Sequence, residues 1–491
     1  MIIVETKMKK QQNKVFFYFL NFILVFFIFT FIKSISFIKI YFPNVSLSHI
    51  IFFLKYNIRG VDSNFVKTYI VSCVYWPVFF ALLITFFVPL IKTIRSLYIR
   101  LTKKKLFKKT VRYINDNHTI ALFFTSLFVI YVSFLFVLFT NWSKIFPPKS
   151  SFYEQYYVSP SDQTFKFPAQ KQNLIIIVAE SLEKTFSNER FFETNLIEPL
   201  DRIKSKGISF ENYTNGYTTI ATQPFFLALS AGVPTTIASK EIINIWGKNT
   251  PQLQNAYTLS DILSDNGYHT LFVGGIDTAF AGQKPFLQSH GFNEKYIDAL
   301  FIREFYPNFK RAGEWGYQDK DVFEITKQEL PKTKQPFFAI VNTIDTHQYY
   351  FPKIEAEKHF SKPEYDLIYN TSSHIADFVN WFEKQTFFEN TTIIIIGDHL
   401  RDGNTLAMPD KRTIYNLFIN SLKTPETTNR TLTQIDLFPT VMESIGITWQ
   451  NHKLGLGVSV FSNEQTLEEK FGTTFLANEL SKRNDLYDGL W

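Results

Sequence analysis

The sequence has one cysteine, Cys73, in 491 residues, so no intramolecular disulfide can form. This excludes the small secreted proteins that disulfides stabilise. Acidic residues are scarce in the first part of the chain: residues 1–150 contain 3 Asp and Glu against 20 Lys and Arg, whereas residues 151–491 contain 41 against 31. The overall net charge of +7 and the mean hydropathy of −0.04 conceal this difference. Such asymmetry excludes a single uniform globule, and an aromatic content of 18% excludes intrinsic disorder.

The basic first part is predicted to be a membrane anchor. Long uncharged apolar runs cover residues 15–32, 68–91 and 119–141. At about 1.5 Å per residue, a helix of the first run reaches roughly 27 Å, close to the hydrocarbon thickness of a bilayer. The sequence therefore predicts three transmembrane helices within an anchor of residues 1–145. A shorter apolar stretch, 48–54, is too short to span and indicates an interfacial or re-entrant segment.

The basic residues predict the orientation of this anchor. The loop 92–112 contains nine Lys and Arg and no acid, and the N-terminal tip is also basic. The positive-inside rule places both in the cytoplasm, so three spans deliver everything after residue 141 to the outside. No small-residue cleavage site follows the first run, which favours an anchor over a signal peptide. Because the basic residues flank apolar runs and form no stripe, no nucleic-acid partner is expected.

The remainder is expected to be a polar linker, 146–172, followed by an α/β domain, 173–491. Short aliphatic runs typical of buried strands occur at 173–179, 270–273, 337–342 and 391–396. Helical patterns lie between them, at 258–266, with Gly267 as its C-terminal cap, and at 370–387. Strands that alternate with helices predict a mainly parallel sheet covered by helices on both faces.

Metal-ligating side chains follow three of these strands directly. Glu180 ends the first run, Asp398 and His399 end the last, and Asp345 and His347 follow the third. Ligands of open parallel sheets bind beyond the carboxyl ends of the strands, so these residues are expected to meet. Oxygen and imidazole ligands without thiolate suit Mn²⁺, Mg²⁺ or Zn²⁺.

The candidate nucleophiles are threonines near the start of an apolar, helix-like run. Thr218, Thr219 and Thr222 precede or begin this run, together with Pro224. A helix N-terminus favours a bound phosphate, and a hydroxyl beside a divalent cation becomes a competent nucleophile. From spacing alone, the alternative that these threonines only cap the helix stays open.

Taken together, seven sequence blocks resemble the membrane-anchored phosphoglycerol transferases of the osmoregulated-periplasmic-glucan type. That family belongs to the alkaline phosphatase/sulfatase superfamily and is related to lipoteichoic acid synthase. The blocks include NLIIIVAESLEKTF (173–186), TTIATQPFFLALSAGVP (218–234), VNTIDTHQYY (341–350), IIIIGDHLRDGNT (393–405) and two segments that lie between them, 267–294 and 314–323. The last block begins with QIDLFPTVMESIGI at residue 434.

The resemblance implies roles for individual residues. It implies one divalent cation, Mn²⁺ first with Mg²⁺ or Zn²⁺ as alternatives, held by Glu180, Thr219, Asp398 and His399. Thr219 is the implied nucleophile because related transferases place a proline five residues later; Thr218 and Thr222 are the alternatives. His347 is the implied acid or base. The expected substrate-binding residues are Asp277, Lys284, His290 and Asp345. The Trp and Arg that lipoteichoic acid synthases use for the headgroup have no evident counterpart.

The implied activity is transfer of a phosphoglycerol headgroup from phosphatidylglycerol to a hydroxyl of an envelope glycan. A phospho-threonine intermediate would form and diacylglycerol would be released, at the outer face of a bacterial inner membrane. One alternative is a phosphoethanolamine transferase acting on lipopolysaccharide or lipid A, although those enzymes usually have disulfide cysteines and more spans. A sulfatase would have Cys or Ser in a CxPxR-like motif, and a non-catalytic scaffold would have lost a metal ligand.

Overall fold

The computed structural model describes residues 2–41, 63–86, 94, 97, 126, 127, 129–131, 133, 148–192, 194–235, 251–312, 316–347, 356–401 and 406–491. These residues divide into two compact units, which we describe separately. One contains the N-terminal helices, and the other contains the described residues from 148 to the C-terminus.

The N-terminal unit is helical. Helix α1 (Ile2–Tyr41) includes the first predicted span, and α3 (Ser63–Ile70) continues through a π-helical turn (Val71–Tyr75) to Phe86. Among the described residues, one helix, Val66–Phe86, is long and apolar enough to cross a membrane, and Tyr18–Ser34 is a shorter apolar helix. Three spans are therefore not confirmed. Most of the third predicted run, the segment 48–54 and most of the loop 92–112 lie outside the described residues.

A seven-stranded mixed sheet, in the order β2-β8-β7-β1-β6-β4-β5, forms the centre of the C-terminal unit. Its strands are β1 (Asn173–Ala179), β2 (Gly207–Ile208), β4 (His269–Gly274), β5 (Lys295–Ile297), β6 (Phe337–Asn342), β7 (Thr391–Gly397) and β8 (Asn416–Ile419). The five strands from β7 to β5 are parallel, and β8 is antiparallel to both β7 and β2. The predicted mainly parallel sheet is confirmed, and each of the four predicted strands is present.

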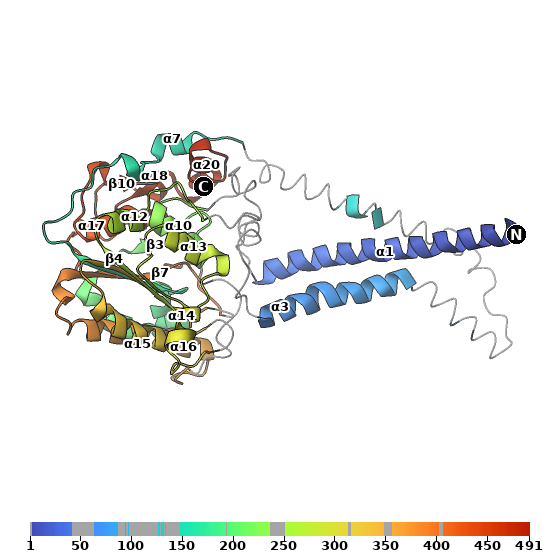
Figure 1. The fold of residues 1–491 in the computed structure, drawn as a ribbon, viewed down its shortest axis with the longest axis horizontal. Helices are drawn as coiled ribbons and strands as arrows, with labels where there is room; N and C mark the ends of the chain where they lie inside the picture. The colour runs from blue at the N-terminus through green and yellow to red at the C-terminus, as the bar shows by residue number, and fades with distance from the viewer. Residues whose placement is uncertain are drawn as a thin grey trace. The chain divides into compact units, whose positions relative to one another are not determined.

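Two apolar cores cover the two faces of this sheet because successive side chains of a strand point to opposite sides. Ile176 and Val178 of β1 pack in one core, and Ile175 and Ile177 pack in the other. Both sets are fully buried, which explains why the strand reads as a continuous aliphatic run. In Figure 1, α10, α12, α13 and α17 lie on one side of β4 and β7, and α14, α15 and α16 lie on the other.

Helices of the C-terminal unit alternate with the strands along the chain. They are α7 (Phe152–Tyr156), α8 (Glu189–Phe192), α9 (Glu198–Ile203), α10 (Thr222–Ala231), α12 (Leu259–Asp265), α13 (Gln283–Ser289), α14 (Ala299–Phe305), α15 (Asp319–Glu329), α16 (Pro363–Phe382), α17 (Leu437–Ser444), α18 (Leu467–Phe471), α19 (Thr473–Leu480) and α20 (Asp485–Gly489). Helix α12 agrees with its prediction, with a capping box at Thr258 and Gly267 at φ +80° beyond its end. Helix α16 starts seven residues before its predicted start, with Pro363 in its first turn.

The segment expected to be a linker packs onto this unit. Phe152 and Tyr153 of α7 are buried, and Val158 and Lys166 form isolated β-bridges with Gly455 and Thr448. Its aromatic residues supply contacts that a solvated linker would not make.

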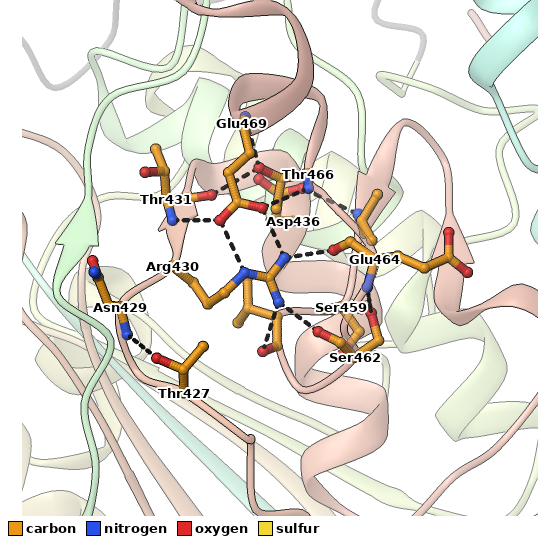
Figure 2. A network of polar contacts seen from close by, with 12 residues as sticks. Thr427, Asn429, Arg430, Thr431, Asp436, Ser459, Ser462, Glu464, Thr466 and Glu469 are labelled. Carbon is orange, nitrogen blue, oxygen red and sulfur yellow. Dashed lines mark hydrogen bonds and ion pairs between the residues drawn. The ribbon is translucent and has the colours of Figure 1, made fainter.

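Short strand pairs and a partly buried ion pair hold the C-terminal segment. Strand β3 (Asn212–Tyr213) pairs with β9 (Thr431–Leu432), and β10 (Lys453–Leu454) pairs with β11 (Gly457–Val458). Arg430 donates two hydrogen bonds, of 2.9 and 2.8 Å, to the carboxylate of Glu469, and it also donates to backbone carbonyls (Figure 2). The same carboxylate accepts from the backbone N–H groups of Thr431 and Thr466. This bidentate pair anchors α18 beside β9.

Gly397, the last residue of β7, permits a close approach between two backbone segments. A Cβ atom there would lie 2.1 Å from the carbonyl oxygen of Leu182 and 2.6 Å from a methyl group of Ile414. The backbone N–H of Gly397 donates to Tyr415 O, and Tyr415 N donates to Leu182 O. A side chain at this position would therefore separate β7 from the segment that follows β1.

We predict that Gly397→Ala lowers the free energy of unfolding by about 1–3 kcal/mol, because the added methyl overlaps backbone atoms. Gly489→Ala is the matched control, since a Cβ at Gly489 meets no atom within 4 Å, and it should change stability by less than about 0.5 kcal/mol. Thermal unfolding of the two variants checks this. Equal melting temperatures for both would contradict the close approach.

Candidate metal centre and active site

The carboxyl ends of β1 and β7 bring Glu180, Asp398 and His399 together. The two strands are parallel neighbours, with Ala179 opposite Gly397, so the residues after them lie side by side. One ligand atom from each of the three side chains lies within 4.8 Å of the others. All three are buried, Asp398 completely. The strand-end expectation thus identified a real cluster.

Ser181 orients both carboxylates, a role that the sequence reasoning did not assign. Its backbone N–H donates to Asp398 Oδ1 at 2.7 Å, and its hydroxyl donates to Glu180 Oε1 at 2.7 Å. Ser181 has φ +50°, a left-handed conformation that is uncommon for a residue with a side chain. A serine directly after the first strand-end Glu was the available signal.

The ring of His399 faces the two carboxylates through Nε2. Its Nδ1 lies 2.9 Å from Leu400 O, and because a carbonyl oxygen only accepts, Nδ1 carries the proton in the neutral ring. Nε2 lies 3.6 Å from Glu180 Oε1 and 3.4 Å from Asp398 Oδ2. A backbone carbonyl on the far nitrogen is the usual partner that fixes a metal-binding histidine.

Burial and mutual repulsion separate the pKa values of the two carboxyl groups. Burial opposes ionisation of Glu180, but the charges of His347 and His399 and hydrogen bonds from Ser181 and Thr222 outweigh it and lower its pKa. Burial and the charge of Glu180 raise the pKa of Asp398 to about 7. Asp398 Oδ2 is buried without a hydrogen-bond partner among the described residues. Two close carboxylates, an imidazole and an orphaned oxygen fit a divalent cation, so this group could hold a metal.

Thr222, the first residue of α10, is the threonine that contacts this cluster. Its hydroxyl donates to Glu180 Oε2 at 2.9 Å, and it is close enough to Asp398 to oppose the rise in that pKa. Thr222 is half-buried, in contrast to the fully buried Thr219. The N-terminus of α10 adds backbone N–H groups and a positive dipole potential that favour a bound anion.

Thr219 and Thr218 make other contacts. The hydroxyl of Thr219, which is fully buried, donates to Gln434 Oε1 at 2.6 Å and to Gly216 O at 3.1 Å. Thr218 is also buried, with φ +60°, and its hydroxyl donates to the carbonyl oxygens of Tyr217 and Thr235. Thr222 thus contacts the carboxylate cluster directly, and the hydroxyl of Thr219 contacts Gln434 and Gly216.

The segment after β6 places His347 near Glu180 and fixes Asp345 in a carboxyl pair. His347 acts on the pKa of Glu180 as a nearby positive charge. Asp345 Oδ2 accepts from the backbone N–H of Asp319 at 3.1 Å, and Asp319 Oδ1 accepts from the N–H groups of Ile344 and Asp345. Burial raises the pKa of Asp319 to about 6, and burial with the charge of Asp319 raises the pKa of Asp345 well above its ordinary value. Asp345 thus supports the loop, and its expected substrate contact stays a prediction.

Lys284 and His290 are likewise engaged in structural contacts. Lys284 Nζ forms an ion pair of 3.1 Å with Asp298, the N-cap of α14. His290 is buried, and its Nδ1 lies 2.7 Å from Asp261 in the capping box of α12. Asp277, the remaining predicted pocket residue, is half-buried after the end of β4, and its Oδ1 accepts from Ala279 N at 3.1 Å.

A second polar group near the cluster, built on Glu183 and Arg401, was missed from the sequence. Glu183 is fully buried, and its carboxylate accepts from Arg401 N and from the guanidinium of Arg412. Arg401 is buried, and its guanidinium donates to Thr346 O. These contacts join the segments that follow β1, β6 and β7.

Similarity to known proteins agrees with this geometry. The Sulfatase family profile matches residues 172–447, more than half of the chain. Phosphoglycerol transferase I of Escherichia coli (strain 55989 / EAEC) is 28% identical over 340 residues, which cover 64% of this chain and 42% of the relative. The same protein of strain K12 gives the same values. The chain thus spans about two fifths of the length of these relatives.

A solved structure shows the same fold. A protein of the alkaline phosphatase superfamily from Vibrio parahaemolyticus superposes with a TM-score of 0.50 and 22% identity, over 67% of this chain and 78% of that one. The lipoteichoic acid synthase LtaP of Listeria monocytogenes gives a TM-score of 0.49 and 17% identity, over 61% and 79%. The predicted resemblance to the alkaline phosphatase/sulfatase superfamily is confirmed, and the chain belongs to the sulfatase family.

Proposed function

We propose that the protein is a membrane-anchored phosphotransferase that moves a phosphoglycerol headgroup from phosphatidylglycerol to a hydroxyl of an envelope glycan. One observation carries the proposal: the hydroxyl of the half-buried Thr222 donates to Glu180 beside Asp398 and His399, at a helix N-terminus. A hydroxyl nucleophile, a cation site and an anion site therefore coincide. The name of the E. coli relatives supports phosphoglycerol as the transferred group.

Thr222 is the proposed nucleophile, in place of Thr219. A nucleophile must reach a phosphorus atom that arrives from outside, and Thr219 is fully buried with its hydroxyl bound to Gln434. Thr222 is half-buried and already contacts a carboxylate of the cluster.

Glu180, Asp398 and His399 would hold one divalent cation, with Thr222 adjacent. Mn²⁺ is the proposed metal, with Mg²⁺ and Zn²⁺ as alternatives, since a set of two carboxylates and one imidazole is hard to borderline. When bound, the cation would lower the pKa of the threonine hydroxyl and neutralise charge on the phosphoryl oxygens.

The reaction would proceed in two displacements. Thr222 loses its proton to solvent and its Oγ1 bonds to phosphorus, while the bond from phosphorus to the diacylglycerol oxygen breaks. His347, whose charge acts on Glu180, delivers a proton to the departing diacylglycerol. The acceptor hydroxyl then gives a proton to His347 and attacks phosphorus; the bond to Oγ1 breaks and Thr222 regains a proton. Asp277, half-buried three residues after β4, is the proposed substrate contact.

A multi-pass anchor in a bacterial inner membrane, with the catalytic domain in the periplasm, completes the proposal. Asn21 is buried in the N-terminal unit, where its amide donates to Thr85 at 3.3 Å and accepts from Ser126 at 3.1 Å. These bonds join segments of all three predicted spans. Polar side chains inside a membrane bundle hydrogen-bond across helices in this way. The anchor would keep the domain next to its lipid donor.

Metal binding should depend on pH because Asp398 must lose its proton to act as a ligand. Below the pKa of about 7, protons compete with the metal, so we expect Mn²⁺ affinity to fall by up to about tenfold per pH unit. Calorimetric titration in two buffers of different ionisation enthalpy should also detect proton release. Asp398→Asn should bind much more weakly, whereas Asp366→Asn, whose carboxylate accepts from His359 N and Phe360 N, should bind normally. Unchanged affinity in Asp398→Asn would remove that residue from the metal site.

Thr222→Val should reduce transfer by at least about a thousandfold, because no hydroxyl remains to form the phospho-enzyme. The wild-type protein is mixed with phosphatidylglycerol and quenched rapidly. Peptide mass spectrometry should then locate the phosphoglycerol group on Thr222. Thr326→Val is a control, since its buried hydroxyl donates to Val322 O within α15. A modification mapped to Thr219, with activity in Thr222→Val, would refute the assignment.

Headgroup-labelled lipids should distinguish the two transferase activities. Membranes containing the protein should move label from phosphatidylglycerol to glycan and release diacylglycerol. Label from phosphatidylethanolamine should stay in the lipid, and the Thr222→Val protein provides the background. Transfer from phosphatidylethanolamine to lipopolysaccharide would favour the phosphoethanolamine alternative.

A further inference from the structure

We propose that Gln434, with Thr219 and Asn215, forms a clamp that positions Thr222 against the metal ligands. The inference rests on the proposed function in taking Thr222 as the nucleophile. In this clamp, Thr219 and Gln434 are positioning residues: they act on the reaction through the place and orientation of Thr222.

The side-chain amide of Gln434 joins two segments that belong to different parts of the chain. Its Oε1 accepts from the hydroxyl of Thr219 at 2.6 Å and from the backbone N–H of Gly216 at 2.7 Å. Its Nε2 donates to Asp398 O at 3.0 Å, and the amide lies fully buried. One side chain thus connects the segment that leads into α10 with the backbone of a metal ligand.

Asn215 closes the same connection from the other side. Its Oδ1 accepts from Leu400 N at 3.0 Å and from Gln434 Nε2 at 3.3 Å. The residues that follow β7 are therefore bound to the segment before α10 at Asp398 and at Leu400. These hydrogen bonds hold the segment before α10 against the residues after β7. The N-terminus of α10 therefore has a defined distance from the cluster.

The conformation of the clamped segment requires such support. Thr218 has φ +60°, and a β-branched residue in the left-handed region is a strained outlier. Its hydroxyl is held by the carbonyl oxygens of Tyr217 and Thr235. Gly216 packs tightly as well, since a Cβ there would lie 3.0 Å from Thr433 Cβ. Thr218 lies four residues before the proposed nucleophile. A strained turn persists when its surroundings over-determine it, and Gln434 supplies part of that restraint through its bonds to Gly216 and Thr219.

Loss of the clamp should reduce the rate of reaction more than binding. A displacement of about 1 Å at a nucleophile costs on the order of a hundredfold in rate. We expect Thr219→Val and Gln434→Met to lower kcat about 10- to 100-fold, with KM for phosphatidylglycerol and Mn²⁺ affinity within about twofold of wild type. The covalent group should still map to Thr222 in both variants. Thr219→Ser, which restores the hydroxyl, should return kcat to within about threefold.

The clamp also predicts coupling and local opening. The kcat of the double variant Thr219→Val/Gln434→Met should lie within about twofold of the kcat of the slower single variant. The reason is that both changes remove the same hydrogen bond, between Thr219 and Gln434. Hydrogen exchange of the amides in 216–223 should be at least tenfold faster in each single variant. Thr326→Val should alter neither kcat nor this exchange.

Several results would overturn the clamp. Wild-type kcat in Thr219→Val, failure of Thr219→Ser to recover activity, or unchanged exchange in 216–223 would each do so. Hydrogen exchange of the amides in 216–223 is measured in parallel with the hydrolysis of bis(p-nitrophenyl) phosphate in the presence of Mn²⁺, for the wild type and for each variant. If wild-type protein transfers nothing from phosphatidylglycerol, the proposed function fails, while the exchange result alone still supports or rejects the clamp.

Discussion

Repulsion between two buried carboxylates is the constraint on which this site depends. Glu180 and Asp398 lie at the ends of neighbouring parallel strands, and their mutual charge helps to raise the pKa of Asp398 to about 7. In the absence of a cation, such a pair is stabilised by donors from the surrounding backbone and side chains. Ser181 supplies one donor to each carboxylate from a left-handed conformation. The protein thereby keeps together groups that favour a divalent cation.

The paired strands of the sheet hold the two carboxylates in place against their repulsion. Strands β1 and β7 are buried on both faces and aligned residue by residue to Ala179 and Gly397. Gly397 allows the segment after β1 to approach β7, and Glu180 N is bonded to Thr343 Oγ1 at 2.9 Å beyond β6. Three parallel strands therefore hold the cluster, and each contributes through the backbone as well as through side chains.

The sequence predicted the parts of the site that depend on strand ends. Glu180, Asp398 and His399 follow aliphatic runs directly, so their meeting required only a parallel sheet. Thr219 was selected by spacing to a proline, but helix α10 begins at Thr222, and a helix start within one turn is poorly determined by sequence. The expected roles of His290 and Lys284 in substrate binding stay predictions. Their contacts with Asp261, in the capping box of α12, and with Asp298, the N-cap of α14, appear only in the tertiary structure. Most of the third predicted span lies outside the described residues, so that span stays a prediction.

Three threonines within five residues have three different environments, and this division explains the local geometry. Thr218 accepts a strained conformation that turns the chain into α10, and Thr219 is buried against Gln434. Thr222 is thereby left as the half-buried hydroxyl at the helix start. A hydroxyl that reacts with a lipid phosphate needs both access to the lipid and a fixed position. A single residue rarely has both properties by itself. Accessible side chains lose order, and well-ordered ones are usually buried. Placing the restraint on the two preceding threonines lets Thr222 remain accessible without losing its alignment to Glu180.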